Sequence, residues 1–186
     1  MKYLYYARHG ESLANTRDMF GSKPGAVNDL GLTVFGRQQA VAAAHDAVAH
    51  ELKPDLIICS PLVRAQETAQ ILATALGYPE QNIETSDLFM ELQFGILEGT
   101  PWSAYWESGK TYYNLGEYAG AETIEILQQR ATKAYEYLQS LPQDTVLVVS
   151  HSAFGRALRR AIHGQPYTDE FVDGTSLPFG EVLQLI

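Results

Sequence analysis

Cysteine is almost absent from this sequence, because Cys59 is the only one among 186 residues. A single cysteine excludes a disulfide within the chain, and no cysteine or histidine cluster has the spacing of a zinc site. Cys59 stands in the apolar run 56–59, so we interpret it as a small buried residue and not as a catalytic thiol. We expect the protein to use neither a metal nor a cofactor.

Long apolar runs are also missing. No stretch approaches the roughly 18 apolar residues of a membrane span. The apolar residues near the N-terminus are too few for the core of a signal peptide, and no cleavage-like site follows them. We therefore expect a cytoplasmic protein that has no contact with membranes.

Positive charge is scarce as well, with 13 Lys and Arg against 22 Asp and Glu and a net charge of −9. Binding to nucleic acid needs a basic face, so this class of partner is disfavoured. A phosphate site in such an acidic protein must gather its few cations locally. The length of the chain suits a single domain over residues 1–186.

Segments typical of strands alternate with segments typical of helices. This alternation predicts an α/β fold, a three-layer α/β/α sandwich with a mostly parallel central sheet. The expected strands are 3–7, 55–59, 145–149 and 181–186, with a further short strand within 83–88. The expected helices are 33–52, 62–76, 123–141 and 153–163. Residues 18–32 form a turn-rich loop. Residues 91–121 are rich in glycine and aromatic residues, and we interpret them as an insertion that forms a lid and shapes substrate choice.

Three of the predicted strands run directly into residues suited to binding phosphate. The first strand is followed by Arg8 and His9, the second by Ser60 to Arg64, and the 145–149 strand by Ser150 and His151. Ligands of open α/β sheets bind at the carboxyl ends of the strands. If these strands are parallel neighbours, two histidines and two arginines meet in one crevice, where helix N-termini add positive charge.

The run Arg8-His9-Gly10-Glu11-Ser12, with Asn15 after it, resembles the signature of the histidine phosphatase superfamily, also called phosphoglycerate-mutase-like. Five further segments follow in the order of that family and extend the resemblance over about residues 3–160. They are Leu32-Thr33 with Gly36, Ser60-Pro61-Leu62 with Arg64, Glu91 with Gly95 and Glu98-Gly99, Gly120-Ala121-Glu122-Thr123 leading to Arg130, and Val148-Val149-Ser150-His151.

The resemblance implies a phosphatase in which His9 accepts the phosphoryl group. Arginine forks match phosphoryl oxygens geometrically, a role that suits Arg8 and Arg64. His9 would attack phosphorus as a neutral imidazole whose other nitrogen donates to a backbone carbonyl. His151 would donate a hydrogen bond to a phosphoryl oxygen. The family's acid, which protonates the leaving oxygen, maps to Glu91, with Glu98 as its rival.

Three further residues are candidate phosphate contacts. Asn15 could donate to a phosphoryl oxygen or could cap the backbone locally. The backbone N–H of Ser152 is available although the family usually has two glycines after the second histidine. Gly21 remains from a Phe-Gln-Gly-like arrangement of the family. Arg130 is expected to be structural, whereas Arg156 lies near enough to His151 to touch substrate.

The sequence favours hydrolysis over phosphoryl isomerisation. Phosphoglycerate mutases of this family carry an arginine directly after the acid-loop glutamate, but Leu92 stands there, and Lys110 is the only cation in 91–121. We therefore expect a phosphatase acting on a small phosphorylated metabolite, as a monomer or homodimer. A mutase and a catalytically weak phospho-ligand-binding module stay open as alternatives. A nucleotide-dependent transferase lacks support, because no Gly-rich Lys-Ser/Thr loop is present.

Overall fold

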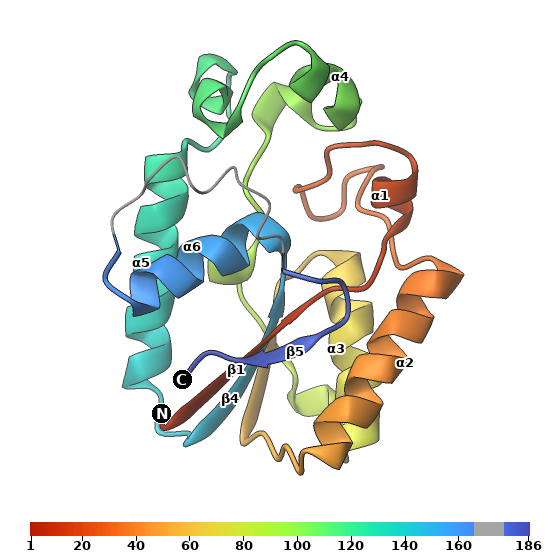
Figure 1. The fold of residues 1–186 in the computed structure, drawn as a ribbon, viewed down its shortest axis with the longest axis vertical. Helices are drawn as coiled ribbons and strands as arrows, with labels where there is room; N and C mark the ends of the chain where they lie inside the picture. The colour runs from red at the N-terminus through yellow and green to blue at the C-terminus, as the bar shows by residue number, and fades with distance from the viewer. Residues whose placement is uncertain (166–176) are drawn as a thin grey trace.

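A five-stranded sheet forms the centre of the computed structural model, which describes residues 1–165 and 177–186 (Figure 1). The strand order is β3-β2-β4-β1-β5, and every pairing is parallel except that of β5, which runs antiparallel to β1 at the edge. The sheet is therefore mostly parallel, as the sequence predicts. The strands are β1 (Tyr3–Arg8), β2 (Leu56–Cys59), β3 (Glu84–Thr85), β4 (Thr145–Ser150) and β5 (Val182–Gln184).

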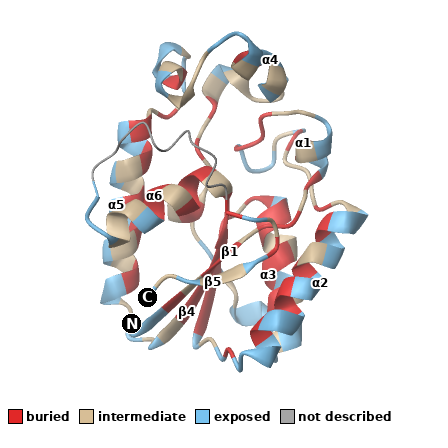
Figure 2. Ribbon diagram, viewed as in Figure 1, coloured by how far each residue is buried: buried red, intermediate tan, exposed pale blue. Residues whose placement is uncertain are grey.

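Helices cover both faces of the sheet and complete the predicted three layers. In Figure 1, α2 (Val34–Ala49) and α3 (Val63–Leu76) lie on one face, and α5 (Ile124–Ser140) and α6 (Ser152–Ile162) lie on the other. Successive side chains of a strand point to opposite faces. Along β4, Val146 and Val148 accordingly join the core with α5 and α6, while Leu147 and Val149 join the core with α2 and α3. Figure 2 shows these strands and the inward faces of the helices as buried.

The helices begin and end close to the predicted residues because their caps are local. Thr33 caps α2 by accepting the Gly36 N–H at 2.9 Å, and Thr123 caps α5 in the same way. Helix α3 ends at Gly77, whose φ of 68° is the left-handed conformation that glycine adopts without strain. Helix α6 begins at Ser152, with His151 as the capping residue.

The short strand predicted within residues 83–88 is present as β3. Only the two residues of β3 pair with β2, and the chain then turns into a 3₁₀ helix over Asp87–Phe89. Helix α1 (Leu13–Thr16) is a single turn capped by Ser12 and is too short to show helical periodicity.

The glycine- and aromatic-rich segment lies over the carboxyl ends of the strands (Figure 1). It contains α4 (Trp102–Glu107) between 3₁₀ helices at Gly95–Leu97 and Tyr112–Glu117. Its aromatic rings pack on each other and on the loop before α2, with Tyr105 lying 5.7 Å from Phe20 and 4.8 Å from Trp106 between ring centroids. Among residues 1–165 and 177–186, no helix has the length and apolar character needed to cross a membrane.

Candidate active site

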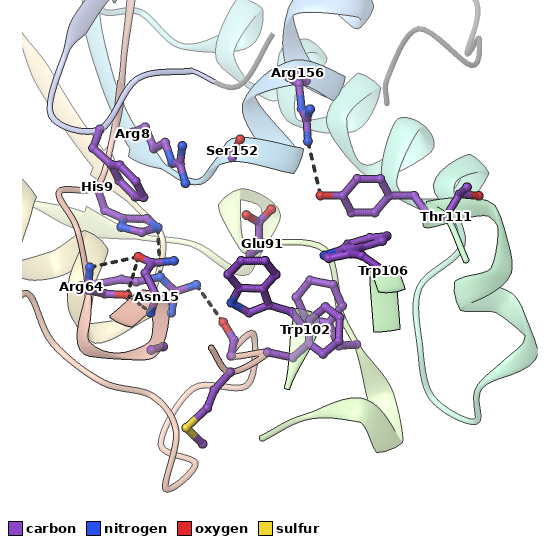
Figure 3. A pocket seen from close by; sticks show the side chains of 18 of the residues that line it. Arg8, His9, Asn15, Arg64, Glu91, Trp102, Trp106, Thr111, Ser152 and Arg156 are labelled. Carbon is purple, nitrogen blue, oxygen red and sulfur yellow. Dashed lines mark hydrogen bonds between the residues drawn. The ribbon is translucent and has the colours of Figure 1, made fainter. Parts of the chain in front are cut away.

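A pocket of about 640 Å³ lies at the carboxyl ends of β1, β2 and β4, beneath the aromatic segment (Figure 3). The parallel register places the ends of these three neighbouring strands together, and His9 continues the ladder by donating its backbone N–H to Ser150 O at 3.0 Å. Most of the predicted site residues line the pocket: Arg8, His9, Asn15, Gly21, Arg64, Glu91 and Ser152. His151 is fully buried beside His9, with 5.1 Å between the ring centroids.

His9 is held as a neutral imidazole with one nitrogen available for attack. Its Nδ1 lies 2.7 Å from the Gly10 carbonyl oxygen, which can only accept, so Nδ1 carries the proton and Nε2 keeps its lone pair. Burial, together with the charges of Arg64 and Arg8, holds the pKa of His9 well below its ordinary value of 6.5. The ring is therefore uncharged near neutral pH, which is the state in which an imidazole can act as a nucleophile.

Two glycines fix the backbone that carries His9. A Cβ on Gly10 would lie 2.2 Å from the Gly36 carbonyl oxygen, and a Cβ on Gly36 would lie 1.9 Å from the Glu11 carbonyl oxygen. Side chains of any size at these positions would push the loop away from the first turn of α2. This close contact explains why positions 10 and 36 are both glycine.

Arg64 connects His9 to the loop over 18–32. Its Nε donates to His9 Nε2 at 3.1 Å and its Nη2 donates to Gly21 O at 2.8 Å. Its buried Nη1 has no hydrogen-bond partner among the described residues, which leaves a donor for a phosphoryl oxygen. Gly21, predicted as a phosphate contact, lines the pocket and supplies the carbonyl that orients this arginine.

Arg8, the last residue of β1, also lines the pocket. Its Nη1 donates to Leu177 O at 2.8 Å, and its guanidinium lies 3.7 Å from the centroid of the Phe179 ring. Burial lowers the pKa of Arg8 to about 10, so the side chain stays charged at neutral pH. Phe179 also lies 5.9 Å from the His9 ring. Sequence reasoning missed Phe179, since no segment that resembles the family reaches it.

His151 is buried against Ser60, whose Oγ lies 2.7 Å from His151 Nε2. The Ser60 oxygen also accepts the Leu62 N–H at 3.3 Å, and its own hydroxyl can donate to Nε2. This arrangement leaves the proton of His151 on Nδ1, which has no partner among the described residues. Burial and the nearby Arg64 hold the pKa of His151 well below 6.5. His151 is thus a neutral donor, and Ser60 is its positioning residue.

Glu91 lies over the first turn of α6. Its carboxylate accepts the backbone N–H groups of Leu92 at 3.0 Å, Phe154 at 3.1 Å and Ala153 at 3.4 Å. The replacement of the family's glycine by Ala153 therefore leaves its N–H in use. In Figure 3 the Glu91 side chain points into the pocket between the basic cluster and the aromatic rings.

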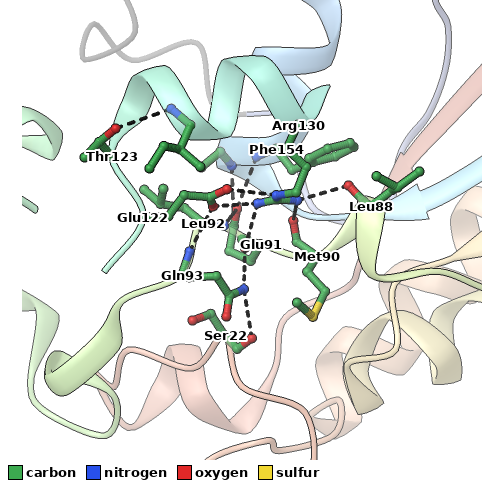
Figure 4. A network of polar contacts seen from close by, with 12 residues as sticks. Ser22, Leu88, Met90, Glu91, Leu92, Gln93, Glu122, Thr123, Arg130 and Phe154 are labelled. Atoms are coloured by element: carbon green, nitrogen blue, oxygen red, sulfur yellow. Dashed lines mark hydrogen bonds and ion pairs between the residues drawn. The ribbon is translucent and has the colours of Figure 1, made fainter. Parts of the chain in front are cut away.

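Arg130 holds the backbone that carries Glu91 (Figure 4). Its guanidinium donates to Leu88 O at 3.0 Å, Met90 O at 2.7 Å and Glu91 O at 3.2 Å, and it forms an ion pair with Glu122 at 2.7 Å. Arg130 does not line the pocket. Its predicted structural role agrees with these contacts.

Glu98, the rival to Glu91, is used elsewhere. Its carboxylate accepts the Ser22 N–H at 2.9 Å, the Ser22 hydroxyl and the Asn28 amide at 2.8 Å, and the side chain does not line the pocket. Glu98 therefore braces the loop over 18–32, and the geometry favours Glu91 as the acid.

The remaining candidates lie at the edge of the basic cluster. Asn15 forms the predicted local cap, because its Oδ1 accepts from the Ser12 N–H at 2.9 Å and from the Ser12 hydroxyl at 2.8 Å, which leaves its NH₂ group as a donor. Ser152 is the first residue of α6. Arg156 lines the pocket, with its Nη2 3.5 Å from the Tyr112 hydroxyl. No group of three His, Cys, Asp or Glu side chains suited to a metal occurs in the part of the chain that the structure describes.

The model of the histidine phosphatase superfamily (branch 1) matches residues 4–173. The chain belongs to this superfamily. Its members are phosphatases or mutases, so the protein is an enzyme of one of these two kinds.

The curated relatives include a phosphatase and phosphoglycerate mutases. The chain is 32% identical over 165 residues to the uncharacterized phosphatase PhoE of Bacillus subtilis, with 88% of the chain and 79% of the relative covered. It is 30% identical over 171 residues to a 2,3-bisphosphoglycerate-dependent phosphoglycerate mutase of Brucella melitensis, with 87% and 81% covered. A match to agropine synthesis reductase of Rhizobium rhizogenes is 30% identical over 91% of the chain, but the chain spans only 37% of that protein.

The fold also agrees with that of a solved structure. The structure of the open reading frame Rv3214 of Mycobacterium tuberculosis superposes with a TM-score of 0.75 and 27% identity, covering 97% of this chain and 89% of the other.

Proposed function

We propose that the protein is a phosphomonoester hydrolase that acts on a small phosphorylated metabolite through a phosphohistidine intermediate at His9. The observation that carries this proposal is the state of His9. It is neutral, its Nδ1 proton is held by Gly10 O, and its Nε2 faces a pocket lined by Arg8 and Arg64. In this protein of net charge −9, such a cluster of cations offers a local site for a phosphate dianion.

In the first step, His9 Nε2 attacks phosphorus as the bond from phosphorus to the ester oxygen breaks. A phosphoryl oxygen takes over the Arg64 Nε–H that contacts His9 Nε2, which frees the lone pair of Nε2. Arg8, Arg64 and the Nδ1–H of His151 neutralise the charge on the transferring group. Glu91 gives its proton to the leaving oxygen, so the product departs as a neutral alcohol.

In the second step, water replaces the alcohol. The Glu91 carboxylate accepts a proton from this water as its oxygen attacks phosphorus. The bond between phosphorus and His9 Nε2 breaks, and inorganic phosphate leaves. The net reaction consumes one water and one ester and yields one alcohol and one phosphate, without a metal or cofactor.

Two observations favour hydrolysis over the mutase reaction. Leu92, at the position where the mutases carry an arginine, is fully buried in the core and cannot meet a substrate carboxylate. Lys110 lines the pocket, but its ammonium group contacts the Tyr118 hydroxyl. On the aromatic side, a bisphosphorylated intermediate, which a mutase must retain, would meet Arg156 and this engaged Lys110 as the cations of the described lining. Isomerisation of a phosphoglycerate at a rate above its hydrolysis would reverse this ranking.

The proposal is tested by trapping the intermediate. Native protein is mixed with a radiolabelled phosphate ester and quenched in base, and we expect base-stable, acid-labile phosphate on the peptide that contains His9. His9→Ala should lose both the label and turnover. His45→Ala, which removes an exposed histidine of α2 far from the pocket, is the matched control and should retain both. Continued turnover by the native protein without any labelled His9 would refute the mechanism.

A further inference from the structure

The pocket is much larger than a phosphate group requires. Its volume of about 640 Å³ lies in the range of sites that enclose whole small molecules. In Figure 3, Arg8, His9, Asn15 and Arg64 gather on one side, Trp106, Thr111 and Arg156 lie on the other, and Glu91 and Trp102 lie between them. The side away from His9 is therefore positioned to hold the group from which phosphate is removed.

Aromatic side chains dominate this second side. Trp102, Trp106 and Tyr112 come from the segment over the sheet, and Phe20 and Phe94 complete the wall. Trp106 is held in place, since its ring centroid lies 4.8 Å from that of Tyr105 and 4.8 Å from that of Tyr112. These contacts make a preformed, rigid apolar surface.

Trp102 differs from its neighbours because its ring is left uncovered. It lines the pocket, is 39% exposed, and has no aromatic neighbour among the described residues. A large apolar side chain exposed inside a pocket marks a surface available to a ligand. Its flat indole face suits another flat ring.

Carboxylates are scarce on the same walls, where the other side-chain acceptors are the hydroxyl groups of Ser12, Thr111, Tyr112 and Ser152. Glu91 is the only carboxylate among the described lining residues, and the Oδ1 of Asn15 is already taken by Ser12. The hydroxyl groups of a sugar or polyol need such acceptors, and burying them without partners carries a penalty. With one carboxylate and many aromatic rings, these walls favour a flat ring over a polyol as the leaving group.

We infer that the preferred substrates are phosphate monoesters whose leaving group carries a planar aromatic or heteroaromatic ring, which stacks on Trp102 beside Trp106. This inference rests on the proposed hydrolase function and names the substrate class of that site. Glu91, placed between the two sides of the pocket, then lies where the ester oxygen would connect the ring to phosphate.

The test compares three esters of primary alcohols, so that differences in leaving-group acidity stay small. Benzyl phosphate has a flat ring, cyclohexylmethyl phosphate has the same carbon skeleton without it, and glycerol 1-phosphate is a polyol. We expect kcat/KM for benzyl phosphate to exceed that for glycerol 1-phosphate by at least about tenfold, from burial of the ring. It should exceed that for cyclohexylmethyl phosphate by about 2- to 10-fold, from stacking.

Substitutions at Trp102 separate stacking from simple apolar contact. Trp102→Leu keeps an apolar side chain but removes the flat ring, and should abolish the preference for benzyl over cyclohexylmethyl phosphate. Trp102→Ala should also reduce the preference of each over glycerol 1-phosphate. Tyr113→Ala removes an aromatic residue of the same segment that is 41% exposed and outside the pocket lining, and should leave all three ratios unchanged. Unchanged ratios in both Trp102 variants would overturn the inference.

Binding can be read directly, because Trp102 and Trp106 are the only tryptophans of the chain and both line the pocket. In His9→Ala, benzyl phosphate should change tryptophan fluorescence saturably and at lower concentration than glycerol 1-phosphate. Equal kcat/KM for benzyl and glycerol phosphates would refute the inference and leave the hydrolase proposal standing. Absence of hydrolysis of every ester, with no labelled His9, would refute the hydrolase proposal itself.

Discussion

Replacing Arg130 by methionine should destabilise the protein strongly, because this arginine is the centre of a largely buried polar network. Its side chain is 16% exposed and that of Glu122 is 7% exposed. Two of its nitrogens contact the Glu122 carboxylate, at 2.9 Å and 2.7 Å, and the other contacts are to the carbonyls of the loop before Glu91. Methionine fills a similar volume without making any of these contacts.

The expected magnitude follows from what is left behind. Removing one partner of a buried ion pair leaves an uncompensated charge and costs about 3–5 kcal/mol. For a chain of this length, a loss of 1 kcal/mol lowers the Tm by about 2–4 °C, so the Tm should fall by about 6–20 °C. The free energy of unfolding would be measured by urea denaturation, and the Tm by calorimetry.

Two further variants show whether the buried charge is responsible. Glu122→Gln combined with Arg130→Met removes the orphaned carboxylate and should be more stable than Arg130→Met alone by about 1–3 kcal/mol. Arg37→Met is the matched control, because it breaks the Arg37–Glu67 pair, whose side chains are 51% and 23% exposed, and should cost at most about 1 kcal/mol. If Arg130→Met costs no more than Arg37→Met, or the double variant is no more stable than the single one, the reasoning is wrong.

Four other expectations concern the site. Glu91→Gln should slow esters with poor leaving groups more than those with good ones, and equal slowing in steady-state assays would remove Glu91 from the acid role. The pKa values of His9 and His151 are held well below 6.5 in the folded state, so below that pH the unfolded chain binds more protons than the folded chain. The free energy of unfolding should therefore fall as the pH drops, by about 1.4 kcal/mol per pH unit for each histidine. Urea titrations of His9→Gln should show a slope smaller by about one proton, and an unchanged slope would contradict this account. Gly36→Ala should displace the loop that carries His9 and cost about 1–3 kcal/mol, whereas a variant of native stability and activity would show that the close contact is unimportant. A strong chelator should leave turnover unchanged, and inactivation reversed by added metal would disprove a metal-free reaction.

The layout of the fold was readable from local signals. β-branched and apolar runs predicted the strands, and Thr33, Thr123 and Gly77 marked helix ends through contacts within a few residues of themselves. A parallel sheet then brings the carboxyl ends of neighbouring strands to one edge. For this reason His9, Arg64 and His151 could be expected together although they are far apart in the chain.

Pairings across long sequence separations had no such local signal. Glu91 and Glu98 stand in the same segment, and only packing shows that one faces the pocket while the other is bound by Ser22 and Asn28. The contact of Ser60 with His151 spans 91 residues and depends on how two strand ends meet. Phe179 reaches Arg8 through an antiparallel edge strand that no motif marks.

The sequence by itself therefore determined the layers of the fold and the identity of the groups suited to phosphate chemistry, because both depend on local patterns of residues. The tertiary structure alone decided which carboxylate faces the pocket, which nitrogen of His9 keeps its lone pair, and which aromatic rings face the space beyond the phosphate. Those outcomes depend on directions of side chains from distant segments, which are set only when the core packs.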